Sequence, residues 1–374
     1  MTPAFDGTLL SVAATPLDTV HGPFVAHTFH EFASGRAMLA VTRGDLRTAE
    51  PLLARLHSSC VTSEVYGGCD CDCVEQLDAA LARVAAERRG AIFYLLQEGR
   101  GAGFVAKARD RMLVQASGDR LTTYDAYAQM GLAKDHRRYG AVAAACRLLG
   151  VTAPLRLLTD NPDKVAALTA EGIAVDGVSG LEPRPSPWNE HYLAAKERAG
   201  HTFVRRIDER GGATPPEPIV AFEPHAVVGA PRFIALATYQ LPIRLAEGPV
   251  WFRVHAYLDT ERAIERVVLT HGDGAEPLVR LQPDTLLDRF PLRTPGLRQR
   301  WLRAAARIAT AGAGCALFTS PDDDPIDGGG LDLLATHLTG RRARPLVDAL
   351  DGGGLAAALA ARGITVAAPV ILGV

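Results

Sequence analysis

The chain has 374 residues, of which 48 % are hydrophobic and 22 % are charged, proportions that are ordinary for a globular protein. Its formal net charge of −2 gives no broad electrostatic case for a nucleic-acid partner, and no apolar run is long enough to predict a membrane partner. The length exceeds what one compact core usually holds, so we expect two domains.

The N-terminal region contains short apolar runs separated by turn residues. Residues 24–32 (FVAHTFHEF) and 36–45 (RAMLAVTRGD) are typical of strands, with a turn at Ser34-Gly35 between them. Ahead of them, MTPAFDGTLLSVAATPL lacks a basic region before an apolar run, so no secretory leader is expected. We expect these strands to frame the segment that follows.

The segment from residue 55 to residue 76 is unusually rich in cysteine. Four of the six cysteines fall within it: Cys60, Cys69, Cys71 and Cys73. Cysteines spaced by one residue on an extended segment point to the same side, and a further thiolate from a neighbouring strand could complete a metal site. Three thiolates with an open position suit catalytic zinc, whereas four would make a structural site. Disulfides are the competing interpretation, although cysteines at i and i+2 rarely pair with each other. Clustered free cysteines also predict a reducing cytoplasm.

Helices and strands alternate after the cysteines, which indicates an α/β (mixed α+β) fold with flanking helices. Apolar residues recur with helical spacing over residues 74–89, and a buried strand is expected at 91–96. That strand leads into QEGRGAGF, at the end of the strand where α/β sheets usually bind ligands. Further elements are predicted as helices at 104–115 and 139–149, strands at 155–159 and 172–180, and helices within 160–172 and 183–201.

These motifs resemble one known family. The spacing Cys60-x10-Cys71-x-Cys73, preceded by Arg-x-His-Ser and followed by Gln-Leu, is similar to the zinc-binding segment of GTP cyclohydrolase II, which opens riboflavin biosynthesis. The resemblance continues through QEGRGAGF, KDHRRYGAVAAACRLLGV, LLTDNP and NEHYLAAKERAGH, over roughly residues 10–205. It implies one zinc ion on Cys60, Cys71 and Cys73; Cys69 is extra to the family pattern. Mg²⁺ bound with the triphosphate is a second candidate cofactor.

The resemblance also implies a nucleotide site. Positively charged side chains would hold the phosphates, and Glu98 and Gln76 would contact the guanine edge. The substrate-binding residues implied are Arg55, His57, Ser58, Gln76, Glu98, Gly99, Arg100, Thr123, Thr159 and Lys164.

Two catalytic residues follow from the segment KDHRRY. In the family, the aspartate at Asp135 is the proposed general base, and the arginine at Arg137 is the proposed nucleophile toward the α-phosphate, with pyrophosphate leaving. An always-protonated guanidinium is a poor nucleophile but a good phosphate clamp, so we expect Arg137 to act electrostatically.

The chain departs from the family pattern at several positions. Ser59, Asp70 and Leu96 replace a glutamate and two arginines. The family's catalytic tyrosine is missing, and Arg111 and Met112 occupy that part of its helix, Met112 being assigned to the catalytic position. Because methionine transfers no proton and arginine stays protonated, the reaction is expected to stop at the formylamino-pyrimidine nucleotide. Tyr124 or Tyr127 could take the place of the missing tyrosine.

The second half of the chain repeats the first. The domains predicted are 1–210, a linker at 211–220 that contains GGATPPEP, and 221–374. The segment from Gly248 matches the segment from Gly22, ARIATAGAGCALF matches ARVAAERRGAIFY at an offset of 224, and AALAARGITV matches AALTAEGIAV at 191. We therefore expect a tandem duplication of the GTP cyclohydrolase II-like domain, whose second copy lacks the chemistry and carries SPDDD where QEGR should stand. Since the family forms homodimers, the second copy predicts a pseudo-dimer within the chain; a homodimer of whole chains is also considered.

Two other functions remain open. Altered residues around the nucleotide favour a ring-opening hydrolase of another nucleotide, such as the pyrimidine nucleotides of uracil breakdown. A zinc-binding regulator without catalysis is the third interpretation, and it is disfavoured because the cysteines, QEGR, Asp135 and Arg137 are kept in one copy and absent from the other.

Overall fold

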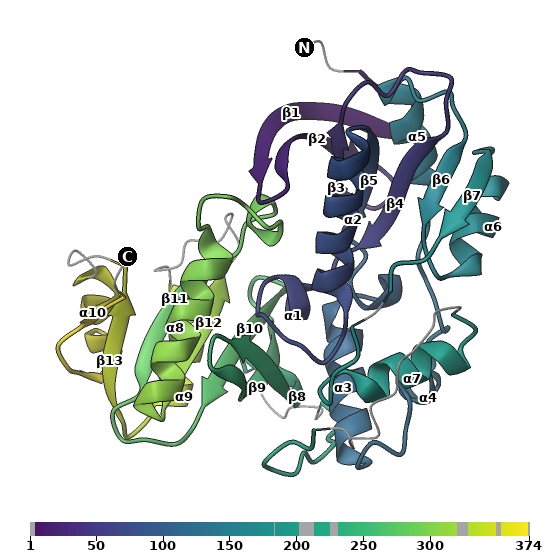
Figure 1. Cartoon of the computed structure of the whole chain (residues 1–374). Helices are drawn as coiled ribbons and strands as arrows, with labels where there is room; N and C mark the ends of the chain where they lie inside the picture. The colour runs from purple at the N-terminus through teal and green to yellow at the C-terminus, as the bar shows by residue number, and fades with distance from the viewer. Residues whose placement is uncertain are drawn as a thin grey trace.

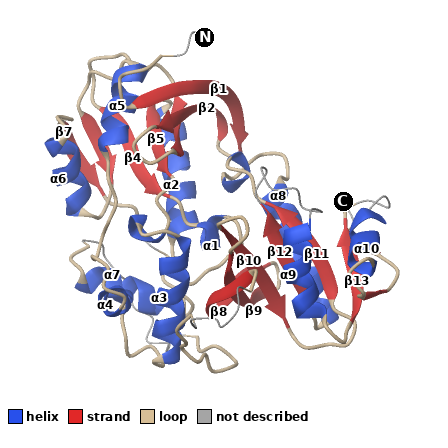
Figure 2. Cartoon of the chain, turned by 180° about the vertical axis from the view of Figure 1, so that it is seen from behind, coloured by secondary structure: helices blue, strands red, loops and turns tan. Residues whose placement is uncertain are grey.

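The computed structural model describes residues 4–182, 184–201, 213–224, 231–319, 328–348 and 353–372. They form two mixed β-sheets with helices packed against them, one sheet in the N-terminal half (residues 4–201) and one in the C-terminal half (residues 231–372) (Figures 1 and 2). The start of the predicted linker at 211–212 and the SPDDD stretch at 320–324 lie outside the described residues.

The first sheet has the strand order β1-β2-β3-β5-β4-β6-β7. The pairs β1–β2, β2–β3 and β3–β5 are antiparallel, and β5–β4, β4–β6 and β6–β7 are parallel. The strands are β1 (Leu9–Thr19), β2 (Gly22–Glu31), β3 (Arg36–Arg43), β4 (Leu52–Ser58), β5 (Gly90–Leu95), β6 (Leu155–Leu158) and β7 (Val175–Ser179).

The central strand β5 explains how helices cover both faces of this sheet. Successive side chains of a strand point to opposite faces. Ile92 and Tyr94 belong to the apolar cluster that contains α2 (Cys73–Glu87), whereas Phe93 belongs to the cluster that contains α5 (Gly140–Leu149). Because both faces are covered, the strand is a continuous apolar run and is wholly buried.

The second sheet has the order β8-β9-β10-β12-β11-β13-β14, and β15 also pairs with β13. Its strands are β8 (Phe233–Leu245), β9 (Gly248–Asp259), β10 (Ile264–His271), β11 (Leu278–Pro283), β12 (Gly314–Thr319), β13 (Arg342–Val347), β14 (Thr365–Val366) and β15 (Val370–Ile371). Its helices are α8 (Leu297–Ala311), α9 (Gly328–Leu338) and α10 (Gly353–Ala360).

The two sheets share one topology. Apart from β15, each strand of the second sheet has the same neighbours and the same directions as its counterpart in the first. Both outer hairpins contain a register shift, between Ser11 and Ala13 in β1 and between Ala235 and Ala237 in β8. A histidine–threonine hydrogen bond of 3.0 Å also recurs, from His27 to Thr42 and from His255 to Thr270.

The halves meet through two loops that occupy equivalent positions. The cysteine loop (residues 59–72) follows β4, and the junction loop (residues 284–296) follows β11. Gly68 of the cysteine loop pairs with Ile243 of β8, and Leu292 of the junction loop pairs with Thr19 of β1. Adding 224 to Gly68 gives Leu292, and adding 224 to Thr19 gives Ile243. The two contacts are therefore equivalent, with the roles of the two halves exchanged.

Neighbouring contacts obey the same offset. Arg244 N donates to Gly67 O (2.9 Å), and Val20 N donates to Pro291 O (2.8 Å). The rings of Tyr66 and Phe318 lie 4.4 Å apart, and those of their counterparts Phe290 and Tyr94 lie 5.2 Å apart. Such reciprocal contacts are those of an interface with two-fold symmetry.

One helical insertion distinguishes the N-terminal half. Between β5 and α5 it contains α3 (Phe104–Ala116) and α4 (Thr123–Gln129), where only residues 320–327 separate β12 from α9. Figures 1 and 2 place α3 beside β8. Gln115 Nε2 donates to Gln240 O (2.7 Å) while Gln240 N donates to Gln115 Oε1 (2.8 Å). Met112 lies in the apolar cluster that α3 shares with β8, β9 and α8.

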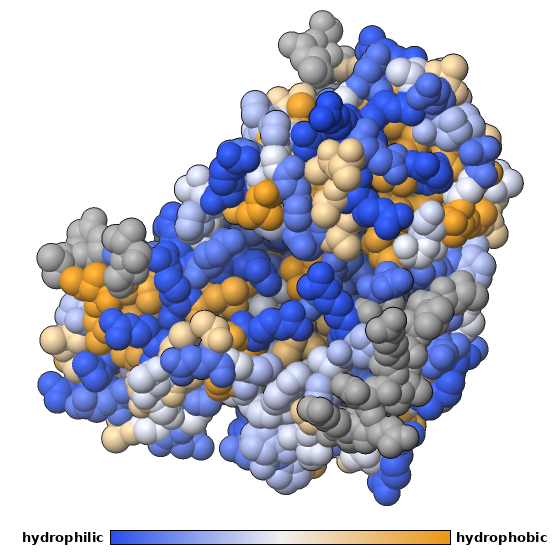
Figure 3. Space-filling model, viewed as in Figure 1, coloured by the Kyte–Doolittle hydropathy of each residue, from blue (hydrophilic) through white to orange (hydrophobic). Residues whose placement is uncertain are grey.

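The face of the molecule shown in Figure 3 carries hydrophilic residues over both halves, with smaller and separate hydrophobic areas. Among the described residues, no helix has the length and apolar character needed to cross a membrane.

Candidate functional site

A cleft of about 870 Å³, open to solvent, lies at the C-terminal ends of β4, β5 and β6. This is where ligands bind in many α/β sheets. All but two of the predicted site residues line it: Arg55, His57, Ser58, Cys60, Cys71, Cys73, Gln76, Glu98, Gly99, Arg100, Thr123, Arg137, Thr159 and Lys164. The two exceptions are Asp135 and Met112.

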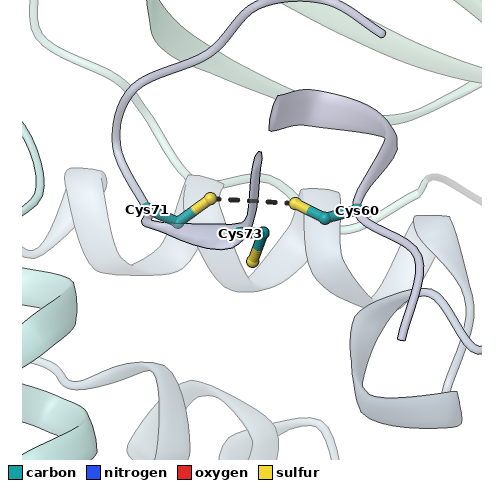
Figure 4. A group of neighbouring side chains, drawn as sticks. All are labelled: Cys60, Cys71 and Cys73. Atoms are coloured by element: carbon teal, nitrogen blue, oxygen red, sulfur yellow. Dashed lines mark hydrogen bonds between the residues drawn. The ribbon is translucent and has the colours of Figure 1, made fainter. Parts of the chain in front are cut away.

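Three cysteines converge on one wall of the cleft (Figure 4). The sulfur atoms of Cys60, Cys71 and Cys73 all lie within 4.8 Å of one another, and those of Cys60 and Cys71 are 3.7 Å apart. Tetrahedral zinc with Zn–S bonds of about 2.3 Å separates its sulfurs by about 3.8 Å, so these thiols fit a zinc ion. The Cys69 thiol has a different neighbour, since it donates to Pro242 O (3.3 Å).

The expectation that Cys71 and Cys73 lie on an extended segment is wrong. Cys60 caps the short helix α1 (Val61–Glu64), and Cys73 is the first residue of α2. A turn followed by a helix start therefore brings the thiols together. A helix N-terminus also favours a thiolate over a thiol, because its free N–H groups carry partial positive charge.

Lys107 and Glu98 lie directly beside the thiols. Lys107 Nζ is 3.0 Å from Cys60 Sγ and 2.7 Å from Glu98 Oε1. Hydrogen bonds from the Cys71 and Cys73 thiols, with the Lys107 ammonium, hold the pKa of Cys60 well below its usual range. The other oxygen of Glu98 accepts from Val61 N (2.7 Å), so each carboxylate oxygen already has a protein partner.

Buried cations also line the cleft. Arg55 is buried. Its Nη1 donates to Leu158 O (2.8 Å), its Nη2 donates to Gln76 Oε1 (2.5 Å), and its Nε has no hydrogen-bond partner among the described residues. Lys164 Nζ donates to Leu56 O (2.7 Å). Burial, with the nearby charges of Arg55 and Arg137, lowers the pKa of Lys164 well below its usual value. A bound anion would relieve this repulsion, so the geometry favours a phosphate-bearing ligand.

The loop that carries Asp135 and Arg137 is tied to the Gln97–Gly103 loop. His136 N donates to Arg100 O (2.9 Å), and a Cβ added at Gly101 would lie 2.9 Å from the His136 carbonyl, so only glycine fits there. Arg137 Nε donates to Asp135 Oδ1 (2.9 Å). Although burial alone would raise it, the pKa of Asp135 is lowered by Arg137. The ion pair makes Asp135 a weak base as it stands, and only Arg137 of the two lines the cleft.

The structure does not place Met112 in the cleft, where its assignment to the catalytic position predicted it. Met112 is fully buried in the cluster against β8, together with Phe104 and Ala108, which precede it by whole helical turns. Lys107 and Arg111, on a neighbouring face of α3, line the cleft. The helix therefore presents Arg111 where the family's tyrosine is expected.

Arg111 compensates for one departure from the family pattern. Its guanidinium is 3.2 Å from a carboxylate oxygen of Asp70, the residue that replaces an arginine. It also lies over the ring of Tyr192, 5.3 Å from its centroid. The acidic substitution near the thiols is thus neutralised by a basic one.

Tyr127, one of the two tyrosines considered as a substitute, lines the cleft, and several further residues of the cleft were not predicted: Ser59, Gln97, Lys107, Asp110, Arg111, Asp160, Asn161, Tyr192, Lys196 and His201. A signal was present in the sequence, because Lys107 and Arg111, like Tyr192 and Lys196, are spaced by one turn within a predicted helix. Lys196 Nζ pairs with Asp72 Oδ1 (2.6 Å), which fixes α7 (Glu190–Arg198) to the cysteine loop.

Comparisons with known proteins concern mainly the N-terminal half. The sequence pattern of the GTP cyclohydrolase II family matches residues 11–179. GTP cyclohydrolase-2 of Azotobacter vinelandii is 41 % identical over 191 residues, which are 51 % of this chain and 90 % of that protein. GTP cyclohydrolase-2 of Pseudomonas putida W619 is 41 % identical over 191 residues, 51 % of this chain and 91 % of that protein.

Two longer proteins also match in part. The riboflavin biosynthesis protein RibBA of Phocaeicola vulgatus is 38 % identical over 188 residues, which are 50 % of this chain and 46 % of that protein. Among solved structures, RibBX, a two-domain 3,4-dihydroxy-2-butanone 4-phosphate synthase from A. baumannii, matches with a TM-score of 0.28 and 16 % identity. That match covers 48 % of this chain and 41 % of RibBX.

Proposed function

The chain belongs to the GTP cyclohydrolase II family, and from that premise we propose that its cleft opens the imidazole ring of GTP with release of pyrophosphate. The observation that carries the proposal is that one cleft combines three converging thiols with the buried cations Arg55 and Lys164. Such cations attract the polyanion of a nucleoside triphosphate.

Zinc is the metal that we propose for Cys60, Cys71 and Cys73, because three thiolates at these separations suit it and leave a fourth position open. When bound, such an ion supplies Lewis acidity toward the water that attacks the ring. The chain's own Lys107 would keep Cys60 as a thiolate.

Arg55, Lys164 and Arg137 would hold the phosphates. Arg55 and Lys164 are fixed by backbone carbonyls, so they require little reorganisation when an anion binds. Arg137 would leave Asp135 partly or wholly to contact the α-phosphate, which would free the carboxylate to accept a proton. Mg²⁺ would accompany the triphosphate.

We further propose that the reaction stops at the formylamino-pyrimidine nucleotide. Release of formate requires a second hydrolysis with its own proton transfer, and such a group contributes typically about 10²–10⁴-fold. Arg111 faces the cleft at the tyrosine position, is held by Asp70 and stays protonated.

One experiment tests the substrate. Metal-replete protein is incubated separately with GTP, UTP and UMP, and the products are identified by mass spectrometry with pyrophosphate and formate assays. The proposal predicts turnover of GTP with pyrophosphate release. Turnover of a pyrimidine nucleotide instead would establish the alternative hydrolase, and binding without turnover would favour a regulator.

We also propose that the chain is a tandem duplication whose C-terminal half occupies the place of a second subunit. The shared strand order and the contacts related by an offset of 224 support it. Light scattering should then find the chain monomeric. A stable dimer that is lost on replacing Trp301, whose Nε1 donates to Tyr66 O (2.9 Å), would contradict the assignment of this junction to one chain.

A further inference from the structure

A buried chain of polar side chains runs from the cleft to the C-terminal half. His57 lines the cleft, and its Nε2 is 2.8 Å from Glu64 Oε1, with both side chains buried. The other oxygen of Glu64 accepts from the Tyr94 hydroxyl, which is also fully buried. The imidazole of His57 and the ring of Tyr94 are stacked, with centroids 5.6 Å apart and planes at 19°.

The protonation of this chain follows from its surroundings. Burial and the nearby Glu64 raise the pKa of Tyr94 well above its usual value, so the hydroxyl remains a donor. Burial lowers the pKa of His57, so its imidazole is neutral and carries one proton. Nε2 faces a carboxyl oxygen of Glu64, so the proton is assigned to Nε2 and Nδ1 is left as an acceptor. Nδ1 is buried and has no hydrogen-bond partner in the described part of the chain.

The C-terminal half completes this chain through the junction loop. Arg289, the last residue of the short helix η2 (Leu287–Arg289), pairs with Asp284 (2.6 Å), and its guanidinium lies close to the Tyr94 hydroxyl. Phe290 packs against the ring of Tyr94. Tyr94 is therefore held by the C-terminal half on one side and by Glu64 on the other.

This polar contact breaks the pseudo-symmetry of the junction. By the offset of 224, the counterpart of Arg289 is Val65 and the counterpart of Tyr94 is Phe318. Val65 and Phe318 lie in one apolar cluster and carry no polar group in their side chains. The arginine–tyrosine contact thus occurs only in the copy of the junction that leads to the cleft.

We propose that Arg289 is a positioning residue: through Tyr94 and Glu64 it holds His57 in the tautomer that offers Nδ1 to an N–H or O–H donor of the bound nucleotide. The inference rests on the proposed function for the identity of that ligand. Without Arg289, the Tyr94 hydroxyl loses its neighbouring cation and is free to turn away from Glu64. His57 then loses the fixed partner that selects its tautomer. The C-terminal half thereby contributes to a cleft whose walls belong to the other half.

Kinetics of the metal-replete, full-length chain with GTP test the proposal. Arg289→Met should lower kcat/KM at least about tenfold, a change of about 1.4 kcal/mol. Arg289→Lys, which keeps a cationic donor, should recover most of the loss. Arg293→Met is the matched control, because Arg293 lies in the same loop and pairs across the junction with Asp18 while both stay exposed. Equal losses in the Arg289→Met and Arg293→Met variants, or no loss in the former, would overturn the proposal.

A second measurement needs no turnover. In protein labelled with ¹⁵N-histidine, the His57 signal is assigned by its loss in His57→Gln. Its two nitrogen shifts should be those of a fixed Nε2–H tautomer in the native chain. They should move toward each other in Arg289→Met but not in Arg293→Met. If the His57 nitrogen shifts were the same in Arg289→Met as in the native chain, the inference would be rejected. A response to Arg289 in a protein that leaves GTP unchanged would reject the proposed function instead.

Discussion

Cys69 and Cys71 are two residues apart, yet their thiols have different neighbours. Cys71 faces Cys60 across 3.7 Å, whereas Cys69 points to the C-terminal half and donates to Pro242 O. Burial, followed by the charge of Asp70, raises the pKa of Cys69 to about 12, so it stays a thiol. The sulfurs of Cys60, Cys71 and Cys73 lie within 4.8 Å of one another and that of Cys69 is not among them, which leaves Cys69 out of the ligand set on geometric grounds.

Zinc content should separate these two cysteines. We expect Cys71→Ser to lose the metal and Cys69→Ser to keep about one zinc per chain, because only the former removes a converging ligand. Elemental analysis of the purified variants measures this. Zinc retained in Cys71→Ser but lost in Cys69→Ser would contradict the ligand set.

Formate release should depend on position 111. Arg111→Tyr would place a hydroxyl in the cleft but leave the Asp70 carboxylate without its partner, so the test combines it with Asp70→Asn. We expect this double variant to release formate along with pyrophosphate, whereas Asp70→Asn with Arg111→Gln should release pyrophosphate alone. Stoichiometric formate from the native chain would disprove the proposed stopping point.

At the residue scale, the thiols and cations singled out from the sequence are brought together in one cleft, because their motifs fix both residue type and spacing. The prediction put Met112 on the side of the helix that faces the cleft. Because the family's tyrosine is missing, no residue of this helical turn could be aligned with the family pattern. Arg111 and Met112 differ by about 100° around α3, which sends one to the cleft and the other to the core.

Helix α3 contacts the cleft and the C-terminal half through two neighbouring faces. One face carries Lys107 and Arg111 to the cleft, and the other packs Phe104, Ala108 and Met112 against the C-terminal half. This explains why the second half needs no equivalent helix: its own β8 receives α3. The helix was predicted from the sequence, but its second partner was not, because β8 is more than a hundred residues away.

Met112→Ala should therefore lower the free energy of unfolding more than it affects the catalytic site. Removing a fully buried methionine side chain typically costs about 2–5 kcal/mol in the free energy of unfolding. Leu113→Ala, on the same helix but only partly buried, should cost less. Urea denaturation measures both, and the zinc content of Met112→Ala should be unchanged. Equal destabilisation by the two variants would mean that α3 is not anchored through Met112.

Most long elements of the N-terminal half were predicted, whereas β1, β4, α1 and α4 were not. The helices α1 and α4 have four and seven residues, too few for a periodic pattern. Only the N-terminal end of α4 carries a recognisable sequence signal, the capping box formed by Thr122 and Asp125. Strand β4 runs directly into the cysteine motif, so its apolar character was masked by residues of the site.

At the scale of the whole molecule, acid should act through half-buried histidines of the C-terminal half. Burial, with Arg341, lowers the pKa of His337 to about 4, and burial, with His337 and Arg253, lowers the pKa of His255 to about 3. Both folded-state values lie below the unfolded value of 6.5. The unfolded chain therefore binds protons first, and stability present above pH 6.5 is lost as the pH falls toward 4.

His337→Gln should reduce this loss. Each histidine that protonates only on unfolding contributes a slope of about 1 kcal/mol per pH unit near pH 5. The glutamine amide can still pair with Tyr257 OH, which lies 3.0 Å from His337 Nε2. Urea denaturation at pH 7 and pH 5 should give a smaller difference for this variant than for the native chain, and exposed His136→Gln should give the native difference.

At the junction between the halves, the two equivalent sets of contacts can change independently of each other. In a dimer of identical chains, one gene encodes both sides of a two-fold axis, so every substitution at the interface appears twice and must be tolerated in both places. Here each copy of the contact has its own codons. An arginine could replace an apolar residue beside Tyr94 while its counterpart beside Phe318 stayed valine. Joining two equivalent halves in one chain thus allows them to become different, one holding the site and the other holding the residue that steadies it.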